Sequence, residues 1–335
     1  MMMKQNLMKK IITTATPQRI SFAGGGTDIN YFYEKHGGIV LSTTIDKFIY
    51  VTVKVHNKLF KEKYRLNYSI TEHVDNLNDI KNEIARECIR FLEIEEHLYI
   101  SSTSDLPALS GLASSSSFAV GLLNALHQLK GDHVSIAQIA EEACHIEISV
   151  LKKPIGKQDQ YAAAFGGVNL FNFNKDGSVI LTPITNPNIY TIFENSLLFY
   201  TDMQRSADEV LNDQKSGFSV NEKNLLEIKE GAVDFYNIVN EKEINLKKLG
   251  ALLHNNWVSK KALSKKISNT LIDEYYQTAL QNGALGGKIL GAGGGGFLFV
   301  ISEKKNHSII AKALKGLEMV DYHFEPVGTR TLLNF

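Results

Sequence analysis

A serine-rich stretch in the first half of the chain has the residue types that bind phosphate. Leu109-Ser-Gly-Leu-Ala-Ser-Ser-Ser-Ser117 leads directly into the apolar segment 118–126, which predicts a loop followed by the first turn of a buried helix. The first amides of a helix have no intrahelical partner and carry the positive end of the dipole, so they can hold phosphate oxygens. Four consecutive serines exceed what one helix cap requires. We therefore predict an anion site here; a serine cap without a ligand is the alternative.

Two glycine clusters could bring backbone close to a ligand. Gly24-Gly-Gly26 precedes Thr27 and Asp28, and Gly291-Ala-Gly-Gly-Gly-Gly296 lies between two β-type runs. The second cluster has the spacing of a dinucleotide-binding loop, but we reject that interpretation because a strand rather than a helix follows it. We expect a strand-turn-strand unit that approaches the active site or the anion loop; a hairpin without function is the alternative. Neither a Walker sequence nor a protein-kinase catalytic loop is present.

Two acidic residues lie where catalysis could use them. Asp159 follows Lys157 and Gln158 directly before an apolar helix, so it could accept or orient a hydroxyl proton, although a helix cap is the simpler interpretation. Glu147 is placed at the end of a predicted helix, where its charge opposes the helix dipole. A bound metal would explain that position, and a solvated glutamate is the alternative.

Cationic and polyol-binding side chains surround these elements. Arg19 and Asp28 flank the first glycine turn, and a sugar-like polyol requires such guanidinium and carboxylate partners. Arg205 follows a predicted strand and precedes a helix start, which makes it a candidate phosphate ligand.

The composition limits the class of protein. The 335 residues contain 36 Lys plus Arg and 36 Asp plus Glu, and no long basic run, so we expect no nucleic-acid or membrane partner. Cys88 and Cys144 both lie in apolar helical patterns and are interpreted as buried small residues in a reducing compartment. Because no signal-like or membrane-spanning apolar run is found, we expect a cytoplasmic protein.

Periodicity predicts the elements that position these residues. Strands are expected at 11–22, 39–45, 48–55 (paired with 39–45), 98–102, 168–173, 178–182, 197–200, 288–290 and 297–300. Helices are expected after Asp28, around 80–92, after the serine loop, from Ser135, after Asp159 and over most of 206–281.

Three sequence blocks, in this order, resemble the GHMP kinases, the superfamily that includes galactokinase, homoserine kinase and mevalonate kinase. The blocks are Thr16-Pro-Gln-Arg-Ile-Ser-Phe-Ala-Gly-Gly-Gly-Thr-Asp28, Pro107-Ala-Leu-Ser-Gly-Leu-Ala-Ser-Ser-Ser-Ser117 and Lys288-Ile-Leu-Gly-Ala-Gly-Gly-Gly-Gly296. Gly156-Lys-Gln-Asp-Gln-Tyr-Ala-Ala-Ala-Phe-Gly-Gly167 is similar to the segment that carries the catalytic aspartate. One departure is Ala113, where many members have glycine; alanine is tolerated there if that residue is already helical.

The resemblance implies an α+β fold of two domains with ATP and substrate in the cleft between them. These would be a ribosomal-S5-like domain at 1–185 and a ferredoxin-like α/β domain at 186–335. The implied reaction moves the γ-phosphoryl group of ATP to the anomeric hydroxyl of a mannoheptose 7-phosphate, giving the 1,7-bisphosphate used in nucleotide-activated heptose synthesis. The implied partners are therefore ATP, Mg²⁺ and a sugar phosphate. The sequence does not determine the oligomeric state, which could be a homo-oligomer.

The resemblance also assigns roles to individual residues. Asp159 would be the base or orienter, and Arg19 would stabilise charge at the reacting oxygen. Magnesium would be held by Ser115 and Glu147. The ATP phosphates would lie on Gly111, Leu112, Ala113, Ser114, Ser115, Ser116 and Ser117. The substrate would contact Gly26, Thr27, Asp28, Gln158, Gly293 and Gly294, with Arg205 or Lys157 on its 7-phosphate.

The sequence is also compatible with other functions. A kinase of the same superfamily acting on fucose or a galactose-like hexose would need no cation for a substrate phosphate. A regulator that binds sugar and ATP without chemistry is less consistent with the presence of Asp159, Glu147 and Arg19 together. A decarboxylase of the superfamily is disfavoured because the first block is of the sugar-kinase type.

Overall fold

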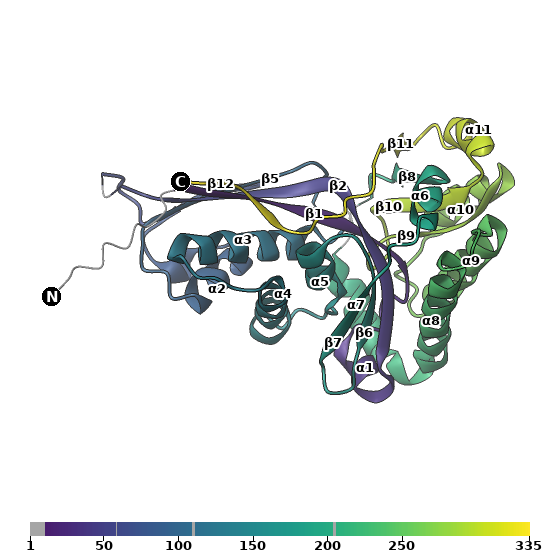
Figure 1. The fold of residues 1–335 in the computed structure, drawn as a ribbon, viewed down its shortest axis with the longest axis horizontal. Coiled ribbons are helices and arrows are strands. Elements are labelled where there is room, and N and C mark those ends of the chain that lie inside the picture. The colour runs from purple at the N-terminus through teal and green to yellow at the C-terminus, as the bar shows by residue number, and fades with distance from the viewer. Residues whose placement is uncertain (1–10, 58, 109–110, 204–205) are drawn as a thin grey trace.

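The computed structural model describes residues 11–57, 59–108, 111–203 and 206–335. Their strands form one large sheet, with a group of helices on one face, and one small sheet packed among the helices of the second half of the chain (Figure 1). This mixed arrangement confirms the predicted α+β class. The division near residue 185 stays a prediction.

The large sheet contains eight strands within the described residues, in the order β12-β1-β2-β5-β3-β4, with β6 paired to β2 and β7 paired to β6. Among the strand pairs of the described residues, β3–β5 alone is parallel. The strands are β1 (Ile11–Ala23), β2 (Gly38–Val55), β3 (Tyr64–Asn67), β4 (Thr71–Val74), β5 (Leu98–Ser104), β6 (Val168–Phe173), β7 (Val179–Pro183) and β12 (Arg330–Asn334). The β6–β7 hairpin confirms the sequence prediction.

Strand β2 corrects the sequence prediction. Residues 39–45 and 48–55 were expected to be two strands paired with each other, but they form one strand of 18 residues. Both halves pair with β1 instead, and a register shift between Pro17 and Gln18 accommodates the step between them. The junction, Asp46-Lys47, lacks the glycine that a two-residue hairpin turn favours, so the chain does not turn back there and continues as one strand.

Helices α3 (Ser114–Lys130) and α5 (Gln158–Phe165) pack directly on one face of the large sheet (Figure 1). Helices α2 (Glu83–Phe91) and α4 (Ile136–Cys144) pack against α3. Helix α3 is buried along most of its length, as its apolar sequence predicts. The hydroxyl of Ser135 caps α4 by accepting the Gln138 amide at 3.1 Å, also as predicted. Cys88 and Cys144 are buried and free.

Helix α4 continues directly into a π-helical turn, residues 145–150, in which successive hydrogen bonds span one residue more than in an α-helix. Helix α1 (Asn30–His36) begins after Ile29 and receives no side-chain cap. The expected cap, Asp28, is therefore not a capping residue, and its carboxylate is used elsewhere.

The second half of the chain builds the small sheet in the order β11-β8-β10-β9. Its strands are β8 (Ser196–Tyr200), β9 (Ala284–Ile289), β10 (Phe297–Ser302) and β11 (Glu318–Met319). The helices are α6 (Asn188–Glu194), α7 (Ala207–Ser216), α8 (Phe218–Val239), α9 (Leu246–Ala262), α10 (Thr270–Gln281) and α11 (His307–Ala313). Short 3-10 turns occupy Leu77–Asp79 and Lys304–Asn306.

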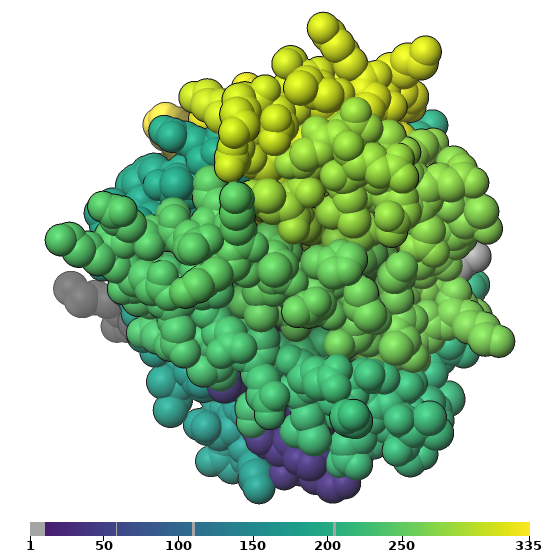
Figure 2. All heavy atoms as spheres, turned by 90° about the vertical axis from the view of Figure 1, so that its right-hand side faces the viewer, coloured from purple at the N-terminus to yellow at the C-terminus, as the bar shows by residue number. Residues whose placement is uncertain are grey.

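The later part of the chain forms one end of the molecule, where segments coloured green to yellow make most of the visible surface (Figure 2). None of the described helices is both long enough and apolar enough to cross a bilayer. Behind this surface, the ring of Phe22 at the end of β1 stacks on Phe235 of α8, with centroids 5.3 Å apart. This contact belongs to an apolar core that joins the two sheets.

The end of the described chain returns to the large sheet. Strand β12 pairs antiparallel with β1, and a buried set of polar groups precedes it. The hydroxyl of Thr329 lies 2.8 Å from that of Thr16 and accepts from Asn124 Nδ2 at 3.2 Å. The hydroxyl of Thr329 therefore connects three elements: the segment before β12, strand β1 and helix α3.

Replacing Thr329 by valine should lower the free energy of unfolding by about 1–3 kcal/mol, because Thr16 and Asn124 would then each lack a buried partner. Urea denaturation measures the change. The control is Thr331→Val at an exposed position of the same strand, which should change stability by less than about 0.5 kcal/mol. Equal effects from both variants would contradict the importance of this network.

Candidate active site

A cavity of about 810 Å³ lies between the large sheet with its helices and the small sheet. Its walls come from the glycine turn after β1, the start of α3, the start of α5, helices α7 and α9, and the turn between β9 and β10. Segments far apart in the sequence therefore meet at one place.

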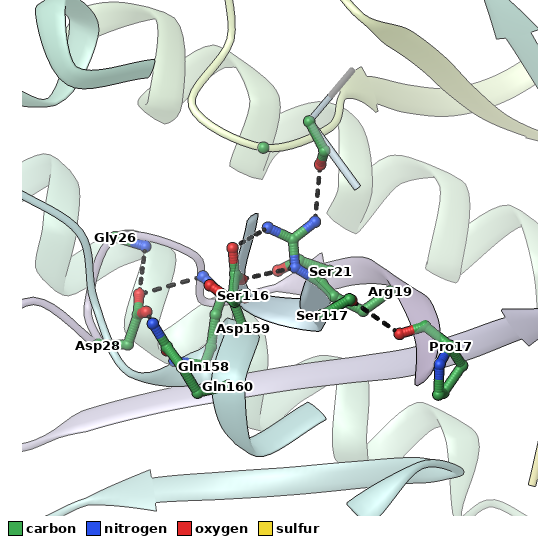
Figure 3. A network of polar contacts seen from close by, with 12 residues as sticks. Pro17, Arg19, Ser21, Gly26, Asp28, Ser116, Ser117, Gln158, Asp159 and Gln160 are labelled. Carbon is green, nitrogen blue, oxygen red and sulfur yellow. Dashed lines mark hydrogen bonds and ion pairs between the residues drawn. The ribbon is translucent and has the colours of Figure 1, made fainter. Parts of the chain in front are cut away.

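The serine loop lies at the cavity as expected. Ser114, Ser115 and Ser116 line it together with Gly111 and Ala113. Since no acidic residue occupies the first turn of α3, the positive end of this helix is not neutralised by its own side chains. Leu112 and Ser117 point instead into the protein: Leu112 is fully buried, and the Ser117 hydroxyl donates to the Pro17 carbonyl at 2.9 Å (Figure 3).

Glu147 is fully buried, which corrects the alternative of a solvated glutamate. Its two carboxylate oxygens accept hydrogen bonds from the hydroxyls of Ser115 and Ser116, each at 2.7 Å. Gln160 Nε2 donates at 2.7 Å, and Lys153 Nζ lies 3.7 Å away. The π-helical turn places this carboxylate under the serine loop, a position that a regular helix end would not give.

Arg19 lies at the centre of the site and is 3% exposed (Figure 3). Its Nε and Nη2 donate to the two oxygens of Asp159 at 2.7 and 2.9 Å, and Nη1 donates to the Gly111 carbonyl at 2.7 Å. Asp159 is thus in the first turn of α5 but is not its cap. The arginine fork fixes both the carboxylate and the serine loop.

The serine loop and the Gly291–Gly296 cluster touch each other through their backbones. A Cβ atom on Gly111 would lie 2.7 Å from the Leu290 carbonyl, and one on Gly291 would lie 2.6 Å from the Gly111 Cα atom. Both residues have a positive φ, at 80° and 69°. Only glycine fits at these two positions, so the second glycine cluster does approach the predicted anion loop.

Asp28 is buried and faces the cavity close to Asp159 (Figure 3). Its oxygens accept from the Gly26 amide at 3.0 Å, the Gln158 amide at 3.1 Å and Gln158 Nε2 at 3.2 Å. Burial and then the nearby charge of Asp159 raise the pKa of Asp28 above its ordinary value. Gly26 and Gln158 also line the cavity.

Several predicted ligands are not brought to the cavity. The Thr27 hydroxyl donates to backbone carbonyls of Gly24 and Ile39, and the Gly294 amide donates to Ile267, whereas Gly293 does line the cavity. Lys157 directs its ammonium group to the Gly177 carbonyl at 2.6 Å. Arg205 lies outside the described residues.

Sequence reasoning missed three lysines that line the cavity: Lys153, which lies 3.7 Å from Glu147, and the two buried residues Lys260 and Lys288. Lys260 of α9 is 8% exposed and Lys288 of β9 is 5% exposed. Lys288 is a cation inside an otherwise apolar strand, which was a visible signal. Lys260 precedes Lys261 in a helix and has the appearance of a solvated residue, so its sequence gave no such signal.

Comparisons with known proteins agree with this geometry. The family profile described as GHMP kinases N terminal domain matches residues 79–167, and that described as GHMP kinases C terminal matches residues 237–316. A D-glycero-α-D-manno-heptose 7-phosphate kinase from Campylobacter jejuni is 32% identical over 96% of this chain and 99% of its own. A galactokinase from Pyrococcus furiosus is 27% identical over 90% and 92%.

The fold is also similar to solved structures. The crystal structure of a D-glycero-D-manno-heptose 1-phosphate kinase from Bacteroides thetaiotaomicron superposes with a TM-score of 0.78 at 22% identity, covering 97% of this chain and 99% of that one.

Alanine was expected to be tolerated at position 113 if that residue were already helical, and the structure does not meet this condition. It precedes α3 in the left-handed region, at φ 67° and ψ 29°, and is not part of the right-handed helix. An alanine Cβ in this region is too close to the following carbonyl oxygen, which costs about 1 kcal/mol relative to glycine.

Ala113→Gly should therefore raise the free energy of unfolding by about 1 kcal/mol, measured by urea denaturation. The matched control is Ala251→Gly, an exposed position inside α9, where the same replacement should lower stability by about 1 kcal/mol. A loss of stability in Ala113→Gly as large as that of the control would show that the backbone of Ala113 is not strained.

Proposed function

This chain belongs to the GHMP kinases, and on that premise we propose that it phosphorylates the anomeric hydroxyl of D-glycero-α-D-manno-heptose 7-phosphate, giving the 1,7-bisphosphate for GDP-heptose synthesis. The chain is an ATP-dependent sugar-phosphate kinase. The observation that supports the catalytic arrangement is that one cavity is lined by both the N-terminus of α3 and a carboxylate that Arg19 holds in place.

In the proposed reaction, the amides and hydroxyls at the start of α3 hold the ATP phosphates. Asp159 orients the acceptor hydroxyl and can accept its proton, while the hydroxyl oxygen attacks the γ-phosphorus. The bond from that phosphorus to the β–γ bridging oxygen breaks, and ADP leaves. Arg19 keeps Asp159 in place and stabilises the negative charge that develops on the phosphoryl oxygens. Asp28, beside Asp159, binds sugar hydroxyls.

Magnesium fits the donor set at the serine loop. The oxygens of Ser115 and Glu147 are the hard ligands that Mg²⁺ prefers. Among the described residues there is no cluster of three or more acidic, histidine or cysteine side chains that could hold a metal. This agrees with an ion held mainly by nucleotide phosphates and water. When bound, Mg²⁺ would neutralise charge on the β- and γ-phosphates.

The choice of acceptor rests on the heptose 7-phosphate kinase, which is 32% identical over nearly the full length of both chains. A free sugar is the main alternative, because a galactokinase is also similar over most of the chain. The clamped Asp159 and the buried Glu147 argue for a working enzyme, since a catalytically silent regulator would need neither.

ADP release in the presence of magnesium-ATP should be observed with the mannoheptose 7-phosphate. It should be much weaker with the unphosphorylated heptose, fucose, galactose or mevalonate, because these acceptors lack the substrate phosphate. A coupled spectrophotometric assay over this panel makes the measurement. Turnover confined to a free sugar would reject the proposed acceptor, and inactivity on all five would favour a regulator.

Asp159→Asn should lower kcat by roughly two to four orders of magnitude, because the amide can neither accept the proton nor pair ionically with Arg19. ATP binding, measured by calorimetry, should change little. Asp176→Asn, in the exposed turn between β6 and β7, is the matched control and should have normal turnover. Near-normal kcat in Asp159→Asn would remove the catalytic assignment.

A further inference from the structure

Two ammonium groups line the cavity without a carboxylate partner. Lys260 Nζ donates to the Gly291 carbonyl, and Lys288 Nζ donates to the carbonyls of Ser21 at 2.8 Å and Phe22 at 3.3 Å. Within the described residues neither forms an ion pair with an acidic side chain. Buried charges in proteins are normally paired, so these two cations are unusual.

The surroundings of these lysines are rich in hydrogen-bond donors and poor in acceptors. An ammonium group has three N–H donors, so two on Lys260 and one on Lys288 are not used by the bonds just described. Trp257 Nε1 and Asn256 Nδ2, both buried next to the lysines in a second cavity of about 10 Å³, also have no acceptor among the described residues. The Ser21 hydroxyl, at the main cavity, is likewise unpartnered.

Asp28, the residue proposed to bind sugar hydroxyls, is close enough to Lys260 for its carboxylate to act on the charge of that lysine. The second cavity, which both lysines line, is also bounded by Gly24 and Gly25 of the turn that leads to Asp28. The ATP phosphates have the start of α3 as their own site. Arg19 differs from the two lysines because its charge is already paired with the Asp159 carboxylate.

We propose that Lys260 and Lys288, with the Ser21 hydroxyl, form the binding site for the phosphate group of the acceptor, called the seat below. This inference rests on the proposed function, in which the acceptor is a sugar phosphate. A phosphate monoester dianion offers only acceptors and carries two negative charges, so it matches both the unused donors and the unpaired cations. These groups take the role that the sequence analysis gave to Lys157, whose ammonium group is bonded to the Gly177 carbonyl.

The lowered pKa values of the two amines agree with a site in which the bound phosphate supplies the missing negative charge. Burial, followed by the charge of Arg19, lowers the pKa of Lys260 to about 8, and the carboxylates of Asp28 and Asp159 oppose this shift. Burial, then Lys260 and Arg19, lowers the pKa of Lys288 well below its ordinary value. A bound dianion favours the charged form of both amines, so its binding should be accompanied by proton uptake.

Lys260→Met tests the seat through its effect on KM. The variant should raise KM for the heptose 7-phosphate by roughly 10- to 100-fold, the usual worth of a buried charge-assisted bond, with kcat changed much less. KM for ATP and the weak turnover of unphosphorylated heptose should stay near wild type. Because methionine fills a similar volume without a buried charge, thermal denaturation should show a folded protein. Lys288→Met is the second variant.

Lys229→Met is the matched control. Lys229 donates to a backbone carbonyl, that of His36, as Lys260 does to Gly291, but it does not line the cavity, so its replacement should leave both KM values unchanged. An unchanged KM for the heptose 7-phosphate in Lys260→Met and Lys288→Met would overturn the proposed phosphate site. A rise in KM for ATP alone would also overturn it. Both results would leave the proposed function intact. A wild-type enzyme that uses only unphosphorylated sugars would overturn both the phosphate site and the proposed function.

Calorimetry gives a readout that a purely structural role would not change. At pH 8 to 9 the ligand phosphate is already a dianion, so proton uptake on binding of heptose 7-phosphate without ATP must come from the protein. Titrations in two buffers of different ionisation enthalpy should show uptake in the wild type and in Lys229→Met, and less in Lys260→Met. Equal uptake in all three proteins would overturn the assignment of Lys260.

Discussion

The hydrogen bonds of Arg19 are the constraint on which the rest of the site depends. The guanidinium group belongs to the long strand β1, yet it bonds to a carboxylate on α5 and to the backbone of the serine loop before α3. Because the fork is planar and rigid, it fixes the distance between the carboxylate that would orient the acceptor and the loop that would hold the donor. In-line transfer depends on that distance, since catalysis of this kind is largely a matter of position.

The remaining contacts hold the two sides of this arrangement in place. Glu147 accepts from two adjacent serine hydroxyls of α3 and ties them to the π-helical turn beneath. The close approach of Gly111 and Gly291 brings the second half of the chain against the serine loop without side chains between them. The cavity is therefore bounded by backbone on the side where the halves meet, which leaves the loop amides free to face a ligand.

The sequence was informative where a local pattern determines a local structure. The serine loop with its buried helix, the cap at Ser135 and the β6–β7 hairpin follow from turn chemistry and periodicity, and the structure confirms them. The partnering of residues 39–45 and 48–55 could not be predicted because pairing with β1 is a non-local interaction. The burial of Glu147 depends on a π-helical turn, for which periodicity offers no sign, and the left-handed conformation of Ala113 contradicts the usual preference of alanine.

The return of β12 to β1 has a consequence for how the protein is made. Strand β1 leaves the ribosome long before residues 330–334, which pair with one of its two edges. During synthesis that edge stays open, with its backbone amides and carbonyls available to any other extended chain. Most of the large sheet can assemble early, yet this edge of β1 stays unpaired until nearly the entire second half of the chain has been made. A stalled or truncated chain would thus carry an exposed strand edge, which is a site for aggregation or chaperone binding.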